Sequence, residues 1–281
     1  MTTDAKRMPV VRPRWQRVLV YSTGGRIVVF VLLMAALFAI TSVAVMALGW
    51  TGDSADRWAR IAGVMLRQIV PAVGAYLLLV YGIERRRPNE LLSPIGPRMA
   101  VFGFAGGMAL ISTVMGLLWI TSAYRVTGTN PEVRWAGGLL VGGLGAAIAE
   151  EIVFRGVLYR IVEERWGMLR ALAVSALLFG GAHLFNPGAT LWTSFAIAVE
   201  AGILLGIVYH VTHSLPAAMG LHMAWNFCEG TVFGGAVSGD TTKYAWLLAE
   251  FDGPDWLTGG RFGVEGSVLT VGVRRPEIAA M

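Results

Sequence analysis

The residues of this sequence that could carry chemistry lie inside long apolar stretches. An ionisable side chain within a membrane-spanning helix costs ~2.5–3.5 kcal/mol on insertion scales, so each one requires a structural or functional reason. Carboxylates and imidazoles can activate water and transfer protons, and imidazoles and amides can donate hydrogen bonds to a developing oxyanion. Six polar residues stand out on these grounds: Glu150, Glu151, Arg155, His183, His222 and Asn226. Two further carboxylates in apolar stretches receive no catalytic role here: Glu200 and Glu229.

The spacing of these residues separates their expected roles. Glu151 and Arg155 are four residues apart, and this order and spacing on a helix favours an ion pair. We expect this pair to be buried and to support the site. Glu150 is rotated by ~100° from Glu151 about the helix axis, so it should face another neighbour as a free carboxylate. His222 and Asn226 are also four residues apart and therefore share one helix face.

The composition indicates a membrane protein. Of the 281 residues, 55% are hydrophobic and 15% are charged, and the mean hydropathy is +0.61. The net charge is +5, yet 21 of the 23 basic residues are arginine and many lie beside the ends of apolar runs. Basic residues in such places set membrane topology, so we expect no nucleic-acid partner. The single cysteine, Cys228, excludes an intrachain disulfide and a multi-cysteine zinc site.

The elements that must position these residues are apolar runs of about twenty residues, each long enough to cross a hydrocarbon core of ~30 Å. The sequence predicts an all-α polytopic transmembrane helix bundle with about seven spanning helices, or eight if the C-terminal part supplies another. We divide the chain into a basic interfacial N-terminal arm (1–26), a transmembrane helical domain (27–237) and a C-terminal tail (238–281), interfacial or disordered. The expected spanning segments are residues 27–50, 61–82, 99–121, 135–160, 170–185, 191–212 and 215–236.

The distribution of basic residues predicts the orientation. The N-terminal arm, the Arg85–Arg87 turn and the stretch from Arg155 to Arg170 alternate with connections that hold few basic residues. Because basic loops remain in the cytoplasm, we expect a cytoplasmic N-terminus in an integral protein, of the cell membrane if the source is bacterial. Two pairs with GxxxG spacing predict close helix–helix packing: Gly103 with Gly107, and Gly202 with Gly206.

Three short motifs occur in a defined order: Glu150-Glu151-x-x-x-Arg155, Phe179-x-x-x-His183 and His222-x-x-x-Asn226. In this order they resemble the motifs of the CAAX-protease and bacteriocin-processing family (the Abi, or type II CAAX endopeptidase, group). The resemblance is strongest over residues 137–235, where the stretch from Gly202 to Pro216 also looks like the segment before the family's last motif. His213, where the family usually has a small residue, and the short C-terminal end depart from the pattern.

The resemblance implies an intramembrane endopeptidase that hydrolyses a peptide bond of a membrane-associated protein or peptide. Glu150 and His183 would then activate water, while His222 and Asn226 would stabilise the oxyanion. In a second form of the mechanism, Glu150, His183 and His222 bind Zn²⁺, because two histidines and a carboxylate with an open position match a catalytic zinc site. The sequence leaves both forms open. The implied partners are the membrane-associated substrate and the lipid bilayer.

Two other functions are consistent with the same residues. A non-proteolytic immunity or scaffold protein would keep the polar cluster for helix packing. A proton-coupled transporter would use the carboxylates and imidazoles as a relay, although the sequence has no clear internal repeat. Cleavage that depends on Glu150 in a folded protein separates the protease from both.

Overall fold

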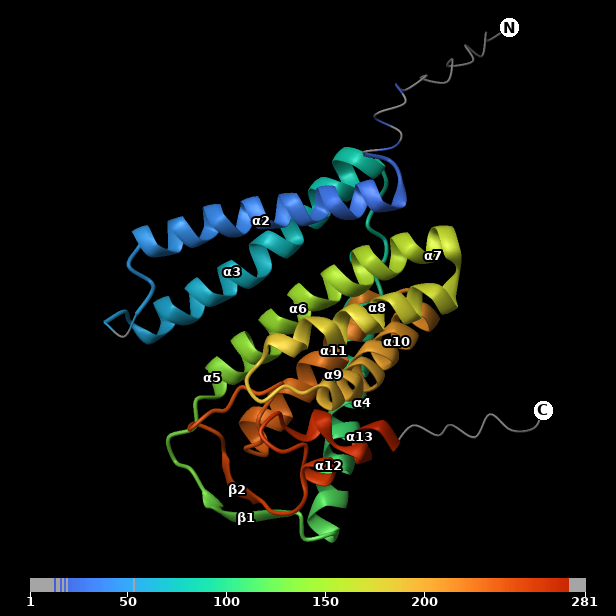
Figure 1. Ribbon diagram of the computed structural model, residues 1–281. Coiled ribbons are helices and arrows are strands. Elements are labelled where there is room, and N and C mark those ends of the chain that lie inside the picture. The colour runs from blue at the N-terminus through green and yellow to red at the C-terminus, as the bar shows by residue number, and fades with distance from the viewer. Residues whose placement is uncertain (1–12, 14–15, 17, 19, 53, 273–281) are drawn as a thin grey trace, which may run out of the picture.

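The computed structural model describes residues 20–52 and 54–272, together with residues 13, 16 and 18. Most of the predicted basic arm (1–26) and the end of the tail (273–281) lie outside the described residues. Helices provide nearly all of the regular structure (Figure 1). The prediction of an all-α polytopic bundle is therefore confirmed.

Within the described residues, seven long helices build the bundle, and most of them continue from α-helix into wider π-helical turns. They are α2 (Thr23–Ala47); α3 (Arg57–Leu77) with its extension Leu78–Glu84; α4 (Gly96–Ile120); α5 (Trp135–Gly137), α6 (Ala146–Glu151) and α7 (Arg160–Trp166), joined through Gly138–Gly145 and Ile152–Tyr159; α8 (Met168–Ala182) with the 3-10 turn His183–Phe185; α9 (Leu191–Ile197) and α10 (Leu204–Thr212), joined through Ala198–Ile203; and α11 (Leu215–Asn226) with its extension Phe227–Val232.

Six of these helices, counted over the described chain, are long and apolar enough to cross a membrane. The seventh, α11 with its extension, lies within the bundle and carries His222, Asn226 and Glu229 on a largely buried surface. Those polar residues reduce its hydropathy. Each of the seven predicted segments thus corresponds to a helix. The last helix differs from the other six because it buries polar residues and is less apolar.

Close glycine contacts fix α11 against α4. A Cβ atom on Gly103 would overlap the carbonyl oxygen of Ala217, and one on Gly107 would overlap that of Leu221. From the other side, Gly220 of α11 faces the backbone of α4 in the same way. Because no side chain separates the two backbones, the position of α11 is set tightly. The predicted packing role of the GxxxG glycines in α4 is confirmed.

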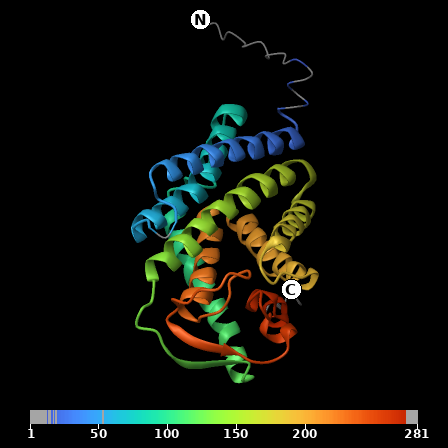
Figure 2. The same ribbon diagram turned by 60° about the vertical axis from the view of Figure 1, so that its left-hand side comes forward.

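Residues 238–272, called the C-terminal segment below, fold against one end of the bundle (Figures 1 and 2). Strand β2 (Leu247–Phe251) pairs antiparallel with β1 (Tyr124–Thr129), which precedes α5. Phe262 and Val264 are fully buried, and the Val264 amide donates to Glu229 Oε1 at 3.0 Å. The expectation of disorder is wrong for this segment, because its apolar residues pack on α4 and α11. Its helices, α12 (Asp255–Thr258) and α13 (Val268–Gly272), are too short to span a membrane.

Candidate active site

Glu151 lies at the centre of the buried polar network. It is fully buried at the end of α6, and its Oε1 accepts a hydrogen bond from Arg155 Nη1 at 2.9 Å. The predicted buried ion pair is therefore present. The same oxygen lies 2.9 Å from His222 Nδ1. Because a carboxylate only accepts, His222 carries its proton on Nδ1 and presents Nε2 on the other side of its ring.

Arg155 is fully buried, and it forms hydrogen bonds with backbone carbonyl groups as well as with Glu151. Its Nη2 donates to the carbonyl oxygens of Ala201 and Gly202, at 2.8 and 3.1 Å. Its guanidinium also lies over the ring of Phe179, 4.9 Å from the centroid. These contacts hold the helices of α6, α8 and α9–α10 together around the site. Arg155 is therefore held by contacts within the protein and does not line the cavity, and its Nε has no hydrogen-bond partner among the described residues.

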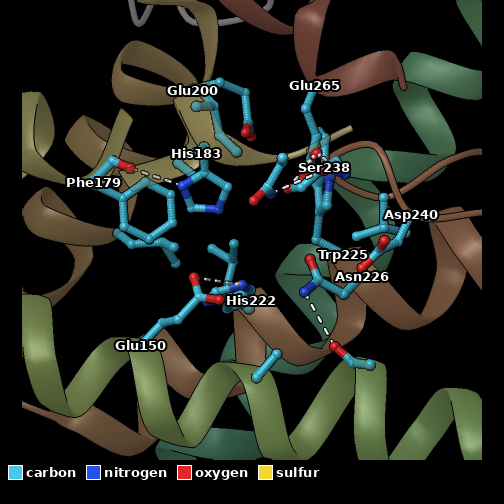
Figure 3. Close-up of a pocket in the computed structure, with 18 of the residues that line it drawn as sticks. Glu150, Phe179, His183, Glu200, His222, Trp225, Asn226, Ser238, Asp240 and Glu265 are labelled. Carbon is cyan, nitrogen blue, oxygen red and sulfur yellow. Dashed lines mark hydrogen bonds and ion pairs between the residues drawn. The ribbon is translucent and has the colours of Figure 1, made fainter. Parts of the chain in front are cut away.

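Glu150 points away from that pair, as its position one residue before Glu151 predicts. Its Oε2 lies 3.9 Å from His222 Nε2 (Figure 3). This oxygen is buried and has no hydrogen-bond partner among the residues that the structure describes. A buried carboxylate oxygen without a donor is costly, so the arrangement favours a ligand. A water molecule at ~2.8 Å from both atoms fits the separation.

His183 ends α8 and is oriented by Phe179, four residues earlier. Its Nδ1 donates to the Phe179 carbonyl oxygen at 2.7 Å, because a carbonyl can only accept. The imidazole also packs on the Phe179 ring, with centroids 4.6 Å apart. The ring of His222 meets Phe179 edge-on at 6.3 Å. Phe179 therefore contacts the imidazole rings of both His183 and His222. Because Nδ1 of His183 is bonded to the Phe179 carbonyl, its Nε2 faces the cavity (Figure 3).

Asn226 lies one turn after His222, on the same face of α11. Its Nδ2 donates to the Gly142 carbonyl oxygen at 3.2 Å. This bond uses one of the two amide hydrogens and ties α11 to the wide turns before α6. The second amide hydrogen is available to a bound group.

A cavity of about 290 Å³ joins these residues. Glu150, His183, His222 and Asn226 all line it (Figure 3). Glu151 and Arg155 are fully buried and are not among the residues that line it. The sequence-predicted residues are therefore brought together from three separate helices. Glu200 also lines the cavity, together with polar residues that no sequence pattern connects with the site: Gln68, Asn186, Ser238, Asp240 and Glu265.

Glu265 is the least expected of these residues, because it comes from the C-terminal segment. Only 3% of its surface is exposed, and its Oε2 accepts from the amide and hydroxyl of Ser238, at 2.5 and 2.8 Å. Burial, followed by the nearby charge of Glu200, raises the pKa of Glu265 to about 7. The one signal in the sequence is a lone carboxylate among apolar and glycine residues. Nothing in that pattern indicates where the segment folds back.

Wide π-helical turns accompany the polar residues of the site. Glu151 directly precedes the turns of Ile152–Tyr159, Glu200 lies within Ala198–Ile203, and Asn226 precedes Phe227–Val232. Such turns frequently occur at functional sites, where they change the angular spacing of neighbouring side chains. A regular 3.6-residue pattern therefore does not give the final directions of these groups.

The metal set expected from the sequence is not assembled. In the part of the chain that the structure describes, no three His, Cys, Asp or Glu side chains lie close enough together to hold a metal ion. The fixed Nδ1 atoms of both histidines would suit zinc ligation through Nε2. Their positions relative to Glu150, however, do not converge on one point, so the residues as placed do not fit Zn²⁺.

Comparison with known proteins gives one family. Residues 132–228 match the family model described as type II CAAX prenyl endopeptidase Rce1-like. The match covers about a third of the chain, includes all six residues predicted from the motifs, and confirms the resemblance noted in the sequence. Searches of curated proteins and of solved structures gave no match. The segment that supplies Ser238, Asp240 and Glu265 follows the matched range.

Proposed function

We propose that this chain, an integral membrane protein with an Rce1-like domain, is an intramembrane endopeptidase that hydrolyses a peptide bond of a membrane-associated protein or peptide. The observation that carries the proposal is the pair of Glu150 and His222. The buried Oε2 of Glu150, which has no hydrogen-bond partner in the described part of the chain, lies 3.9 Å from His222 Nε2 at the cavity wall. Such a pair is suited to hold and deprotonate one water molecule.

The proposed first step is attack of this water on the scissile carbonyl carbon. Glu150 takes a proton from the water as the carbon–oxygen bond forms, and a tetrahedral oxyanion results. The carbon–nitrogen bond then breaks, and Glu150 passes its proton to the leaving nitrogen. The products are a carboxylate and an amine. His183 lines the same cavity with Nε2 directed into it, so it can accept a hydrogen bond from the attacking water.

Stabilisation of the oxyanion is assigned to α11. His222 can donate from Nε2 in its doubly protonated form, which takes its second proton from solvent before the substrate binds, and Glu151 at Nδ1 balances that charge. Asn226 can donate its second amide hydrogen from one turn further along the helix. Losing one such donor typically reduces the rate by ~10²–10³-fold. In this scheme Glu151 and Arg155 are positioning residues.

The test compares protein termini in membranes of cells that make the wild type, Glu150→Gln or Glu132→Gln at equal levels. Glu150→Gln keeps the shape of the side chain but removes the base. Glu132 is exposed and lies outside the cavity, so its variant is the matched control. New termini should appear with the wild type and Glu132→Gln and be absent with Glu150→Gln.

The competing functions give different results in the same cells. If the termini are unchanged while Glu150→Gln abolishes the protein's phenotype, a scaffold or relay function is favoured over proteolysis. Cleavage that persists in a folded Glu150→Gln protein would refute the role of Glu150. The zinc form of the hypothesis, with Glu150, His183 and His222 as ligands, is tested separately by chelation.

A further inference from the structure

Gln68 of α3 is a polar side chain of the cavity wall that the proposed mechanism does not use. It lies in a helix long and apolar enough to cross a membrane, and it lines the cavity together with Glu150 and Asn226. Its Oε1 is buried, and neither Oε1 nor Nε2 has a hydrogen-bond partner in the part of the chain that the structure describes. An amide withdrawn from water without partners destabilises a fold, so Gln68 requires a reason other than packing.

Gln68 lies against the helix that carries Glu150. A Cβ atom on Gly145 would overlap Gln68 Oε1, so the amide occupies space that this glycine leaves open. Gly145 lies five residues before Glu150, and Ala146, which lines the cavity, lies four residues before it. At ~1.5 Å rise per residue, the amide therefore lies beside a turn ~6–8 Å along the helix axis from Glu150.

The helix face between these two groups suits an extended main chain. Gly142 and Ala146 line the cavity eight and four residues before Glu150, and neither presents a side chain larger than a methyl group. Each peptide group of a main chain that lies there has one N–H donor and one carbonyl acceptor. The Gln68 side chain is itself an amide with two donor hydrogens and one acceptor oxygen, so it can pair with a peptide group in either direction.

The same distances give the position of this contact along the substrate. An extended chain advances ~3.3 Å per residue, so ~6–8 Å corresponds to about two residues. A peptide group bonded to Gln68 would then lie about two residues from the peptide bond held at Glu150. Holding a reacting group at a fixed distance from its catalyst accelerates the chemical step, because the correct orientation is already established.

We propose that Gln68 is a substrate-binding residue whose amide pairs with a main-chain peptide group about two residues from the cleaved bond. This inference rests on the proposed endopeptidase function and adds how the substrate is aligned. The contact reads the main chain and not a side chain, so it serves substrates of different sequence. Gln68 lies outside the residues 132–228 that match the Rce1-like model.

Gln68→Met separates substrate binding from packing. Methionine has nearly the same length and replaces an amide that has no partner in the described chain, so thermal unfolding in mixed micelles should show unchanged or increased stability. The value of kcat/KM should nevertheless fall by ~10-fold for a synthetic peptide that spans a Glu150-dependent cut. A variant that loses stability along with cleavage would show that Gln68 supports the fold, and the inference would be wrong.

The second measurement uses purified protein in liposomes and a series of such peptides, each with one backbone amide near the cut replaced by an ester. An ester lacks the N–H and has a weaker acceptor carbonyl, so it reports a hydrogen bond in either direction. At one position about two residues from the cut, the ester should lower kcat/KM of the wild type by ~10-fold and that of Gln68→Met by less than ~2-fold. Ester effects that are the same in both proteins at every position would overturn the inference and leave the endopeptidase function intact.

Gly145→Ala tests the same contact without changing Gln68. Its methyl group would displace the ends of two flexible side chains, Gln68 and Met65, so the helix should still form and the ester effect should shrink. Gly137→Ala meets open space and lies outside the active-site cavity, so as the matched control it should cut every peptide as the wild type does. A full ester effect in Gly145→Ala would contradict the placement of the contact. If no cut depends on Glu150 at all, this inference and the endopeptidase function fail together.

Discussion

Replacing Glu151 by glutamine tests whether this buried carboxylate both balances the charge of Arg155 and orients His222. Glutamine can keep its carbonyl oxygen where Oε1 lies, 2.9 Å from both Arg155 Nη1 and His222 Nδ1. The geometry is then retained and only the negative charge is lost. Arg155 is left fully buried without its counter-ion. Breaking a buried pair in this way costs ~3–5 kcal/mol.

The structure favours the lower end of that range. Arg155 keeps its two bonds to the carbonyl oxygens of Ala201 and Gly202, which partly compensate its charge. We therefore expect a loss of about 3 kcal/mol in the free energy of unfolding, or roughly 100-fold in the folding equilibrium. The measurement is unfolding of the purified protein in mixed micelles, followed by circular dichroism.

The double variant Glu151→Gln/Arg155→Met separates the two tasks. Methionine removes the orphaned charge, and apolar replacement of a whole buried pair is often neutral or stabilising, so most of the lost stability should return. His222 would still lack the carboxylate at Nδ1, and cleavage should stay reduced by ~10- to 100-fold, as is typical for loss of an orienting partner. Recovery of cleavage together with stability would show that Glu151 acts through Arg155 alone. A Glu151→Gln protein as stable as the wild type would refute the ion-pair reasoning.

Three further predictions follow from the packing, the charge and the ligand geometry. Gly103→Ala should destabilise the bundle by ~1–3 kcal/mol, because its Cβ would overlap the backbone of Ala217, whereas Gly106→Ala on the same helix meets open space and should be neutral in the same unfolding assay. The pKa of Glu265 is raised from its ordinary 4.5 to about 7 by burial and by Glu200, so the folded state binds its proton more tightly than the unfolded chain. Stability should therefore fall as the pH rises from about 4.5 to 7, and thermal unfolding of Glu265→Gln should show a flatter pH profile than the wild type or Glu250→Gln. Cleavage should survive treatment with a zinc chelator, because no three potential ligands lie together in the described part of the chain; a loss that added Zn²⁺ alone restores would support the zinc form instead.

The C-terminal segment adds to the cavity residues that lie outside the range matched by the Rce1-like model. The Rce1-like match ends at residue 228, and it contains the motif residues from Glu150 to Asn226. One wall of the cavity comes from later residues, including Ser238 and Glu265.

The sequence by itself determined the helical membrane architecture and most of the local pairing. Apolar runs of spanning length predict the helices because the backbone must satisfy its own hydrogen bonds in hydrocarbon, and a continuous run of ~20 apolar residues does so as a helix. The four-residue spacing of Glu151 and Arg155 predicts their ion pair, since those positions lie on one helix face. The same periodicity turns Glu150 away from the pair. These are local properties, and local geometry is what a sequence specifies directly.

Only the tertiary structure decided which distant groups meet. His222 bonds to Glu151 across 71 residues, and no spacing rule relates two helices that far apart. The wide helical turns beside Glu151, Glu200 and Asn226 depart from the regular period and redirect side chains. Glu265 reaches the cavity because short apolar elements of the C-terminal segment pack on α4 and α11. Such packing depends on the shapes and buried surfaces of residues that are far apart in the sequence, and these residues meet only when the chain has folded.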